Sequence, residues 1–163
     1  MKIIVLGVGN ILLSDEGVGV RAVEFLKREY QLPPEVEVID GGTSAMEMLD
    51  DLAYADHLII VDAVRSGKPP GTLVRIAGED VPVFLKTKLS PHQIGLSDVL
   101  ATLVVTGEAP GGVTVIGVEH FSLATSMALT PQIEALLPRV VAQVLVELRQ
   151  LGIVSERIAE EVA

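Results

Sequence analysis

The stretch that decides the fold lies at residues 3–17 and reads IIVLGVGNILLSDEG. It opens with four aliphatic residues, and so short an apolar run is typical of a strand buried on both faces of a parallel sheet. Similar runs rich in β-branched residues occur at residues 36–39, 58–61 and 113–118, and a weaker one occurs at 72–76. These runs predict the strands of one sheet.

Between the strands, apolar residues recur with the period of an α-helix. The helices predicted in this way lie at residues 18–30, 44–54, 96–104 and 137–151. Strands that alternate with helices indicate an α/β fold, a three-layer sandwich with a mostly parallel sheet and helices on both faces. Right-handed crossovers bring the carboxyl ends of the parallel strands to one edge, where such folds bind their ligands.

The chain has 163 residues, a length that suits one domain with its own core. We expect a single α/β domain over residues 1–152 and an acidic tail at 153–163. Lys and Arg together number 12 and Asp and Glu number 22, so the formal net charge is −10. This acidic balance argues against nucleic acid and anionic membranes as partners.

Cysteine is absent from the sequence. Disulfides, thiolate metal sites and a cysteine nucleophile are therefore excluded. The apolar run near the N-terminus is far shorter than the roughly 18 residues of a membrane-spanning helix, and no signal-peptide cleavage pattern follows it. We expect a cytoplasmic protein.

The loop after the first strand matches a dinucleotide-binding fingerprint only in part. Gly7 and Gly9 follow the strand, but Leu12 stands where the fingerprint requires a third glycine. A non-catalytic nucleotide- or cofactor-binding α/β module therefore stays open only as the alternative function. A serine hydrolase is disfavoured because no G-x-S-x-G elbow is present.

Two carboxylates and one imidazole are predicted at the ligand-binding edge of the sheet: Glu16, Asp62 and His92. Two oxygen donors and one nitrogen donor suit a borderline divalent metal such as zinc or nickel, with positions left for water or substrate. Each residue also has a structural explanation. Glu16 could stabilise the N-terminus of a helix, Asp62 could cap a loop, and His92 could be a polar residue at the start of a helix. Chemistry alone leaves both interpretations open.

The sequence also allows predictions about four other polar residues. Because neighbouring residues do not share a helix face, at most one of Asp15 and Glu16 should point into the cleft. Asp40 precedes two glycines and is compatible with turn chemistry. His57 precedes the third strand, at the opposite edge of the sheet, and is predicted to lie on the surface. His120 follows the last parallel strand, at the same edge as the candidate site.

At residues 7–19 the sequence GVGNILLSDEGVG is similar to the opening motif of the nickel–iron hydrogenase maturation endopeptidases. The DGGTS at residues 40–44, the strand that ends at Asp62 and the SPHQ at residues 90–93 resemble later blocks of that family, in the same order. The resemblance extends from residue 1 to about 151. It departs from the family at residues 119–120, where related sequences commonly carry Gln or Glu followed by Pro.

The resemblance implies a five-stranded sheet of order 2-1-3-5-4 with the fourth strand antiparallel. It also implies a protease that removes a C-terminal peptide from the hydrogenase large-subunit precursor after nickel insertion. By residue, Glu16, Asp62 and His92 match the metal-contacting trio of the family. Asp40 matches an acidic position implicated in activity.

On this resemblance, the metal is nickel that the precursor already holds, and the trio completes its coordination. Zinc or cadmium could take its place in a crystal. The expected partner is the precursor, and the expected oligomeric state is a monomer. Either nickel or a carboxylate would activate water, so a metal-dependent and an aspartate-type mechanism both stay open. A hydrolase with its own tightly held zinc also stays open.

Overall fold

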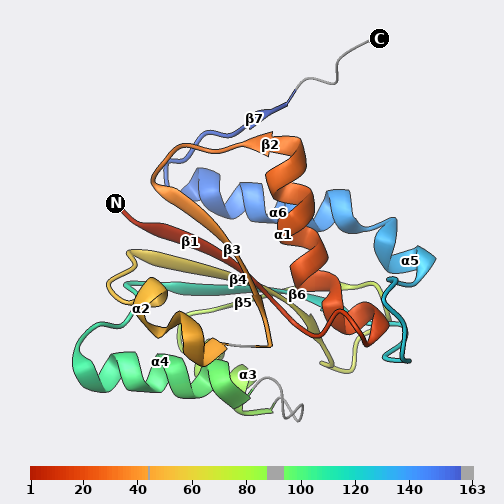
Figure 1. Cartoon of the computed structure of the whole chain (residues 1–163), viewed down its shortest axis with the longest axis horizontal. Coiled ribbons are helices and arrows are strands. Elements are labelled where there is room, and N and C mark those ends of the chain that lie inside the picture. The colour runs from red at the N-terminus through yellow and green to blue at the C-terminus, as the bar shows by residue number, and fades with distance from the viewer. Residues whose placement is uncertain (44, 88–93, 159–163) are drawn as a thin grey trace.

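Five strands form the central sheet of the computed structural model, which describes residues 1–43, 45–87 and 94–158 (Figure 1). In the order of the sheet they are β3 (Val36–Gly42), β1 (Ile3–Val8), β4 (His57–Val64), β6 (Val113–Glu119) and β5 (Leu73–Ala77). The first four are parallel, and β5 pairs with β6 in the antiparallel sense. Counted along the chain this is the order 2-1-3-5-4 with the fourth strand antiparallel, which confirms the expected fold.

The three inner strands are buried along almost their whole length. Every residue of β1 is buried, and in β4 and β6 only the first residue is partly exposed. Aliphatic side chains on both faces of these strands leave no polar face for solvent, as is typical of a sheet covered on both sides. The predicted alternation of strands and helices therefore describes the observed layers.

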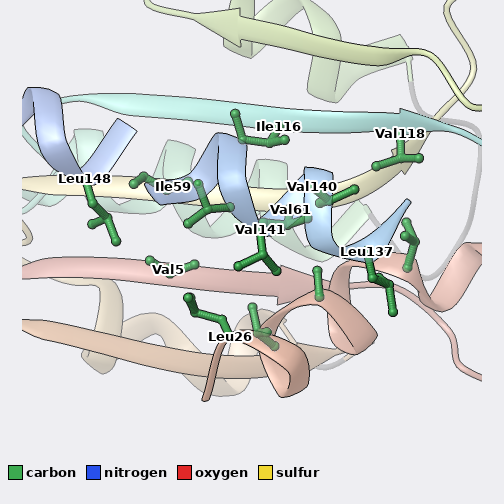
Figure 2. Close-up of a cluster of buried hydrophobic side chains, with 14 of the residues drawn as sticks. Val5, Leu26, Ile59, Val61, Ile116, Val118, Leu137, Val140, Val141 and Leu148 are labelled. Carbon is green, nitrogen blue, oxygen red and sulfur yellow. The ribbon is translucent and has the colours of Figure 1, made fainter. Parts of the chain in front are cut away.

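Helices cover both faces of the sheet (Figure 1). On one face lie α1 (Val18–Glu29), the short α5 (Pro131–Glu134) and α6 (Leu137–Gln150). On the other lie the 3₁₀ helix η2 (Ala45–Met48), α2 (Leu49–Leu52), α3 (Asp80–Thr87) and α4 (Ile94–Thr106). Figure 2 shows how β1, β4 and β6 meet α1 and α6 through aliphatic side chains such as Val61, Ile116 and Val141. Within the described residues, no helix is long and apolar enough to cross a membrane.

Two parts of the fold were not predicted from the sequence. Helix α3 contains Pro82, which lies in the first turn, where a missing N–H breaks no intrahelical hydrogen bond. The two-residue strands β2 (Tyr30–Gln31) and β7 (Glu156–Arg157) pair with each other in the antiparallel sense. Ile153 is buried in the core, and the backbone N–H of Ile158 donates to the carbonyl oxygen of Glu29, so residues 153–158 are attached to the domain at both ends.

Candidate active site at the carboxyl edge of the sheet

The loop after β1 turns back sharply because Gly9 has no side chain. Its φ is +135°, a value that L side chains rarely adopt, and a Cβ there would lie 1.9 Å from the carbonyl oxygen of Glu16. The chain therefore folds over Gly9 into the 3₁₀ helix η1 (Ser14–Gly17). Glu16 is placed by this turn.

The start of α1 packs very closely on the sheet. A Cβ at Gly19 would lie 2.0 Å from the carbonyl oxygen of Val61, and one at Gly7 would lie 2.3 Å from the carbonyl oxygen of Gly19. Gly19 thus provides the close helix–strand contact that a dinucleotide fold obtains from its third glycine. Because Asp62 directly follows Val61, this contact brings η1 and the end of β4 to the same edge of the sheet.

Glu16 and Asp62 are both buried at this edge, with 8% and 1% of their surface exposed. Two buried carboxylates can bind a divalent cation or accept a proton from water. The third predicted residue, His92, lies outside the described residues. Among those that the structure describes, no three metal-ligating side chains come together, so the complete trio remains a prediction.

Buried acids at this turn also bear on the nucleotide-binding alternative. A bound phosphate would have to approach the N-terminus of α1, which attracts anions through its free N–H groups. Asp15 and Glu16 occupy η1, immediately before that helix, and both are buried. Two carboxylates in this position disfavour a phosphate, and the glycines of the loop are explained by close packing.

Asp40 lies apart from Asp62. Asp40, Gly7 and Val61 are in register across β3, β1 and β4, which places Asp40 two strands away from β4, about 10 Å across the sheet. The side chain is exposed, and its Oδ1 accepts a hydrogen bond of 3.0 Å from the backbone N–H of Gly42. The described contact is therefore the turn contact that the sequence allowed, and a role in catalysis stays a prediction.

Asp15 has a role that sequence reasoning missed. Its carboxylate is fully buried and accepts hydrogen bonds from the backbone N–H groups of Phe121, Ser122 and Thr130, at 2.9, 3.1 and 2.8 Å. The hydroxyl of Thr130 donates to it as well, at 3.0 Å. Asp15 thus ties the loop after β6 to η1. Since its carboxylate is bonded to that loop, Asp15 is a structural residue, and Glu16 stays the predicted acid of the site.

A second pair of contacts joins the loops that follow β4 and β6. Buried Glu119 accepts hydrogen bonds from the backbone N–H of Ser66, at 2.7 Å, and from the Ser66 hydroxyl. The Nδ1 of His120 lies 3.2 Å from the carbonyl oxygen of Val64. Both residues at the departure from the family pattern therefore stabilise the chain just after Asp62.

The prediction that His57 lies on the surface is wrong. His57 is half-buried at the start of β4, and its Nε2 lies 3.0 Å from the hydroxyl of Thr114 on the adjacent strand β6. Burial lowers the pKa of His57, and the nearby Arg75 lowers it further, against an opposing effect of Glu147. The position at the opposite edge of the sheet was predicted correctly, and it makes His57 a structural residue.

The sequence and the fold of this chain are similar to those of known proteins. Residues 20–147 match the family model described as hydrogenase maturation protease. The chain is 51% identical, over 94% of each sequence, to the hydrogenase 2 maturation protease of Escherichia coli. It is 40% identical to the hydrogenase expression/formation protein HupD of Thiocapsa roseopersicina, over 96% of this chain and 72% of that protein.

Solved structures show the same likeness. The hydrogenase maturating endopeptidase HybD from Escherichia coli superposes with a TM-score of 0.93 at 49% identity, over 96% of this chain and 98% of that one. The hydrogenase 2 maturation peptidase of a Thaumarchaeota archaeon superposes with a TM-score of 0.68 at 33% identity, over 93% and 99%. The chain therefore belongs to the hydrogenase maturation protease family and is an endopeptidase that acts on a protein.

Proposed function

We propose that this endopeptidase removes the C-terminal extension of a nickel–iron hydrogenase large-subunit precursor after nickel insertion. It acts in the cytoplasm as a monomer. The observation that supports this most directly is the burial of both Glu16 and Asp62, which lie on η1 and near the end of β4, two elements that contact each other. The relatives are named for the maturation of hydrogenase, which supplies the class of substrate.

Nickel enters this proposal as part of the substrate. Glu16, Asp62 and His92 would offer two carboxylate oxygens and an imidazole nitrogen to nickel held by the precursor. Such donors bind more weakly than thiolates, and the chain has no cysteine that could retain the metal. Recognition can therefore be reversible, and a precursor without nickel would be poorly bound. Zinc or cadmium is expected to occupy the same donors when nickel is absent.

Peptide hydrolysis needs a water molecule activated next to the scissile carbonyl. In the proposed reaction water adds to the carbonyl carbon, the C–N bond breaks, and the leaving amine takes up a proton. The buried carboxylate of Glu16 or Asp62 can accept the proton of that water, and nickel in the precursor can polarise the carbonyl. Asp40, two strands away from β4, would act at the periphery of the candidate site.

The test is cleavage of the nickel-loaded precursor from the organism that encodes this chain. We expect Glu16→Gln, Asp62→Asn and His92→Ala each to slow cleavage by roughly a hundredfold or more, because general acid–base or metal contacts are lost. Exposed Asp51→Asn is the matched control and should cleave like the wild type. Normal cleavage by all three variants would refute the site.

Metal dependence needs a separate arm of the same assay. Precursor prepared without nickel should remain uncleaved by the wild-type enzyme, and equal cleavage of both preparations would refute nickel recognition. Metal analysis of the purified enzyme then distinguishes the proposal from a zinc hydrolase. One zinc per chain that survives dialysis would favour the hydrolase.

A further inference from the structure

Two loops at the carboxyl edge of the sheet carry no charged residue. Residues 8–14 read VGNILLS and residues 121–130 read FSLATSMALT. Charged residues make up 21% of the chain, so three or four would be expected in a stretch of this total length. Solvent-exposed loops ordinarily carry charges, and depletion of charge is characteristic of the core of a protein–protein interface.

The same loops expose large apolar side chains. The exposed fraction is 53% for Leu12, 44% for Phe121, 37% for Leu123 and 63% for Met127. We call these four residues the apolar edge. Aromatic residues and methionine are enriched where proteins bind one another, and clustered exposed apolar side chains mark such sites.

The loops lie against each other and form one surface. The backbone N–H of Ser126 donates to the carbonyl oxygen of Leu12 at 3.0 Å, and the N–H of Ser14 donates to the carbonyl oxygen of Ser126 at 2.8 Å. The buried Asp15 accepts hydrogen bonds from both ends of the loop at residues 121–130, and Arg21 donates to the carbonyl oxygen of Met127 at 3.0 Å. A surface fixed in this way loses little conformational entropy when a partner binds.

The apolar edge is continuous with the candidate active site. Leu12 lies on the loop that leads to Glu16, and residues 121–130 follow β6, the neighbour of the strand that ends near Asp62. A protein whose scissile bond reaches these carboxylates must cover this edge of the sheet. The substrate is therefore the partner that the position of the surface favours over a second copy of the chain.

We propose that the apolar edge binds an apolar patch on the folded part of the large-subunit precursor, next to the extension that is removed. This inference rests on the proposed function and adds a recognition surface to it. The side chains that donate to the metal would bind nickel, and the apolar edge would bind the folded part of the precursor. Binding at this second place supplies affinity, so its loss should raise the precursor concentration needed for half-maximal rate.

The test compares two double variants in the precursor-cleavage assay. Leu12→Gln with Met127→Gln removes two exposed apolar side chains of the apolar edge. Val104→Gln with Val105→Gln is the matched control, because both valines are exposed and lie at the end of α4, near the opposite edge of the sheet. Circular dichroism and thermal unfolding verify that both variants fold.

For the first variant we expect a rise of about tenfold or more in the half-saturating precursor concentration, with the rate at saturation unchanged. The control should match the wild type. If the wild type cleaves the precursor and the variant has the same half-saturating concentration, the inference about the apolar edge is refuted and the proposed function stays intact. Absence of cleavage by the wild type would instead refute the proposed function.

Two other results would also contradict the inference. A fall in the saturated rate alone would mean that the loops act on the reacting groups rather than on docking. If sedimentation showed a wild-type dimer that the variant dissociates, with unchanged cleavage, the surface would be a self-interface. Substituting Leu12 and Met127 by Ala provides a second variant should the Gln pair fold poorly.

Discussion

Replacing Asp15 by Asn tests a buried carboxylate at the active-site edge that accepts several hydrogen bonds. Asn has nearly the same shape, but an NH₂ group replaces one carboxylate oxygen. Oδ1 accepts from the N–H of Thr130, and Oδ2 accepts from the N–H groups of Phe121 and Ser122. In either orientation of the Asn amide, its NH₂ group faces a backbone N–H, either that of Thr130 or those of Phe121 and Ser122, and these donors lose their acceptor.

The cost can be estimated from these contacts. A hydrogen bond to a charged group contributes roughly 1.5–3 kcal/mol, and a buried donor left without a partner costs about 1–3 kcal/mol. Because Asp15 is fully buried, solvent cannot replace the lost acceptor without opening the loop. Allowing for partial relaxation, we expect Asp15→Asn to lower the free energy of unfolding by about 3 kcal/mol. For a chain of this size that corresponds to a decrease of roughly 6–12 °C in Tm.

Denaturant unfolding measures this loss, and amide hydrogen exchange locates it. Protection should decrease first at the amides of Phe121, Ser122 and Thr130. Exposed Asp51→Asn is the control and should change the free energy of unfolding by no more than about 0.5 kcal/mol. A loss below about 1 kcal/mol for Asp15→Asn, with unchanged exchange in residues 121–130, would refute the reasoning.

Two further predictions follow from contacts on the sheet. Gly19→Ala would force a Cβ to within 2.0 Å of the Val61 carbonyl oxygen, so denaturant unfolding should show a large decrease in the free energy of unfolding. The control is Gly107→Ala, where φ is +76° but the surroundings are open, and the expected decrease is only roughly 1 kcal/mol. Equal decreases for the two variants would contradict the close packing. Because burial lowers the pKa of His57, the unfolded chain binds a proton first as the pH falls below about 6.5, and stability decreases with it. The loss of unfolding free energy between pH 7.5 and 5.5 should therefore be smaller in His57→Gln than in the wild type, and equal losses would show that His57 does not contribute.

Much of the fold could be predicted because its information is local. The apolar runs that became β1, β4 and β6 are buried on both faces, and the stripes that became α1 and α6 pack on them. Helix α3 was not predicted, and it accommodates Pro82 because this residue lies in the first turn. The order of the strands came from resemblance to a family, since periodicity does not determine which strands are neighbours.

The candidate site shows the same division. The sequence alone indicated that Glu16 and Asp62 arrive at one edge, because parallel strands end there. It predicted neither the structural role of Asp15 nor the partial burial of His57, because the partners of these residues are far away along the chain. Asp15 meets Thr130 after 115 residues, and His57 meets Thr114 after 57.

The sequence by itself determined the class of fold, the family resemblance and the absence of charge in two separate loops. Only the tertiary structure decided that these loops are hydrogen-bonded to each other, that Asp15 holds one of them, and that their exposed apolar side chains form one surface beside Glu16. The physical reason is that helical and strand periods arise between near neighbours. Buried hydrogen bonds and shared surfaces exist only after distant segments have packed together.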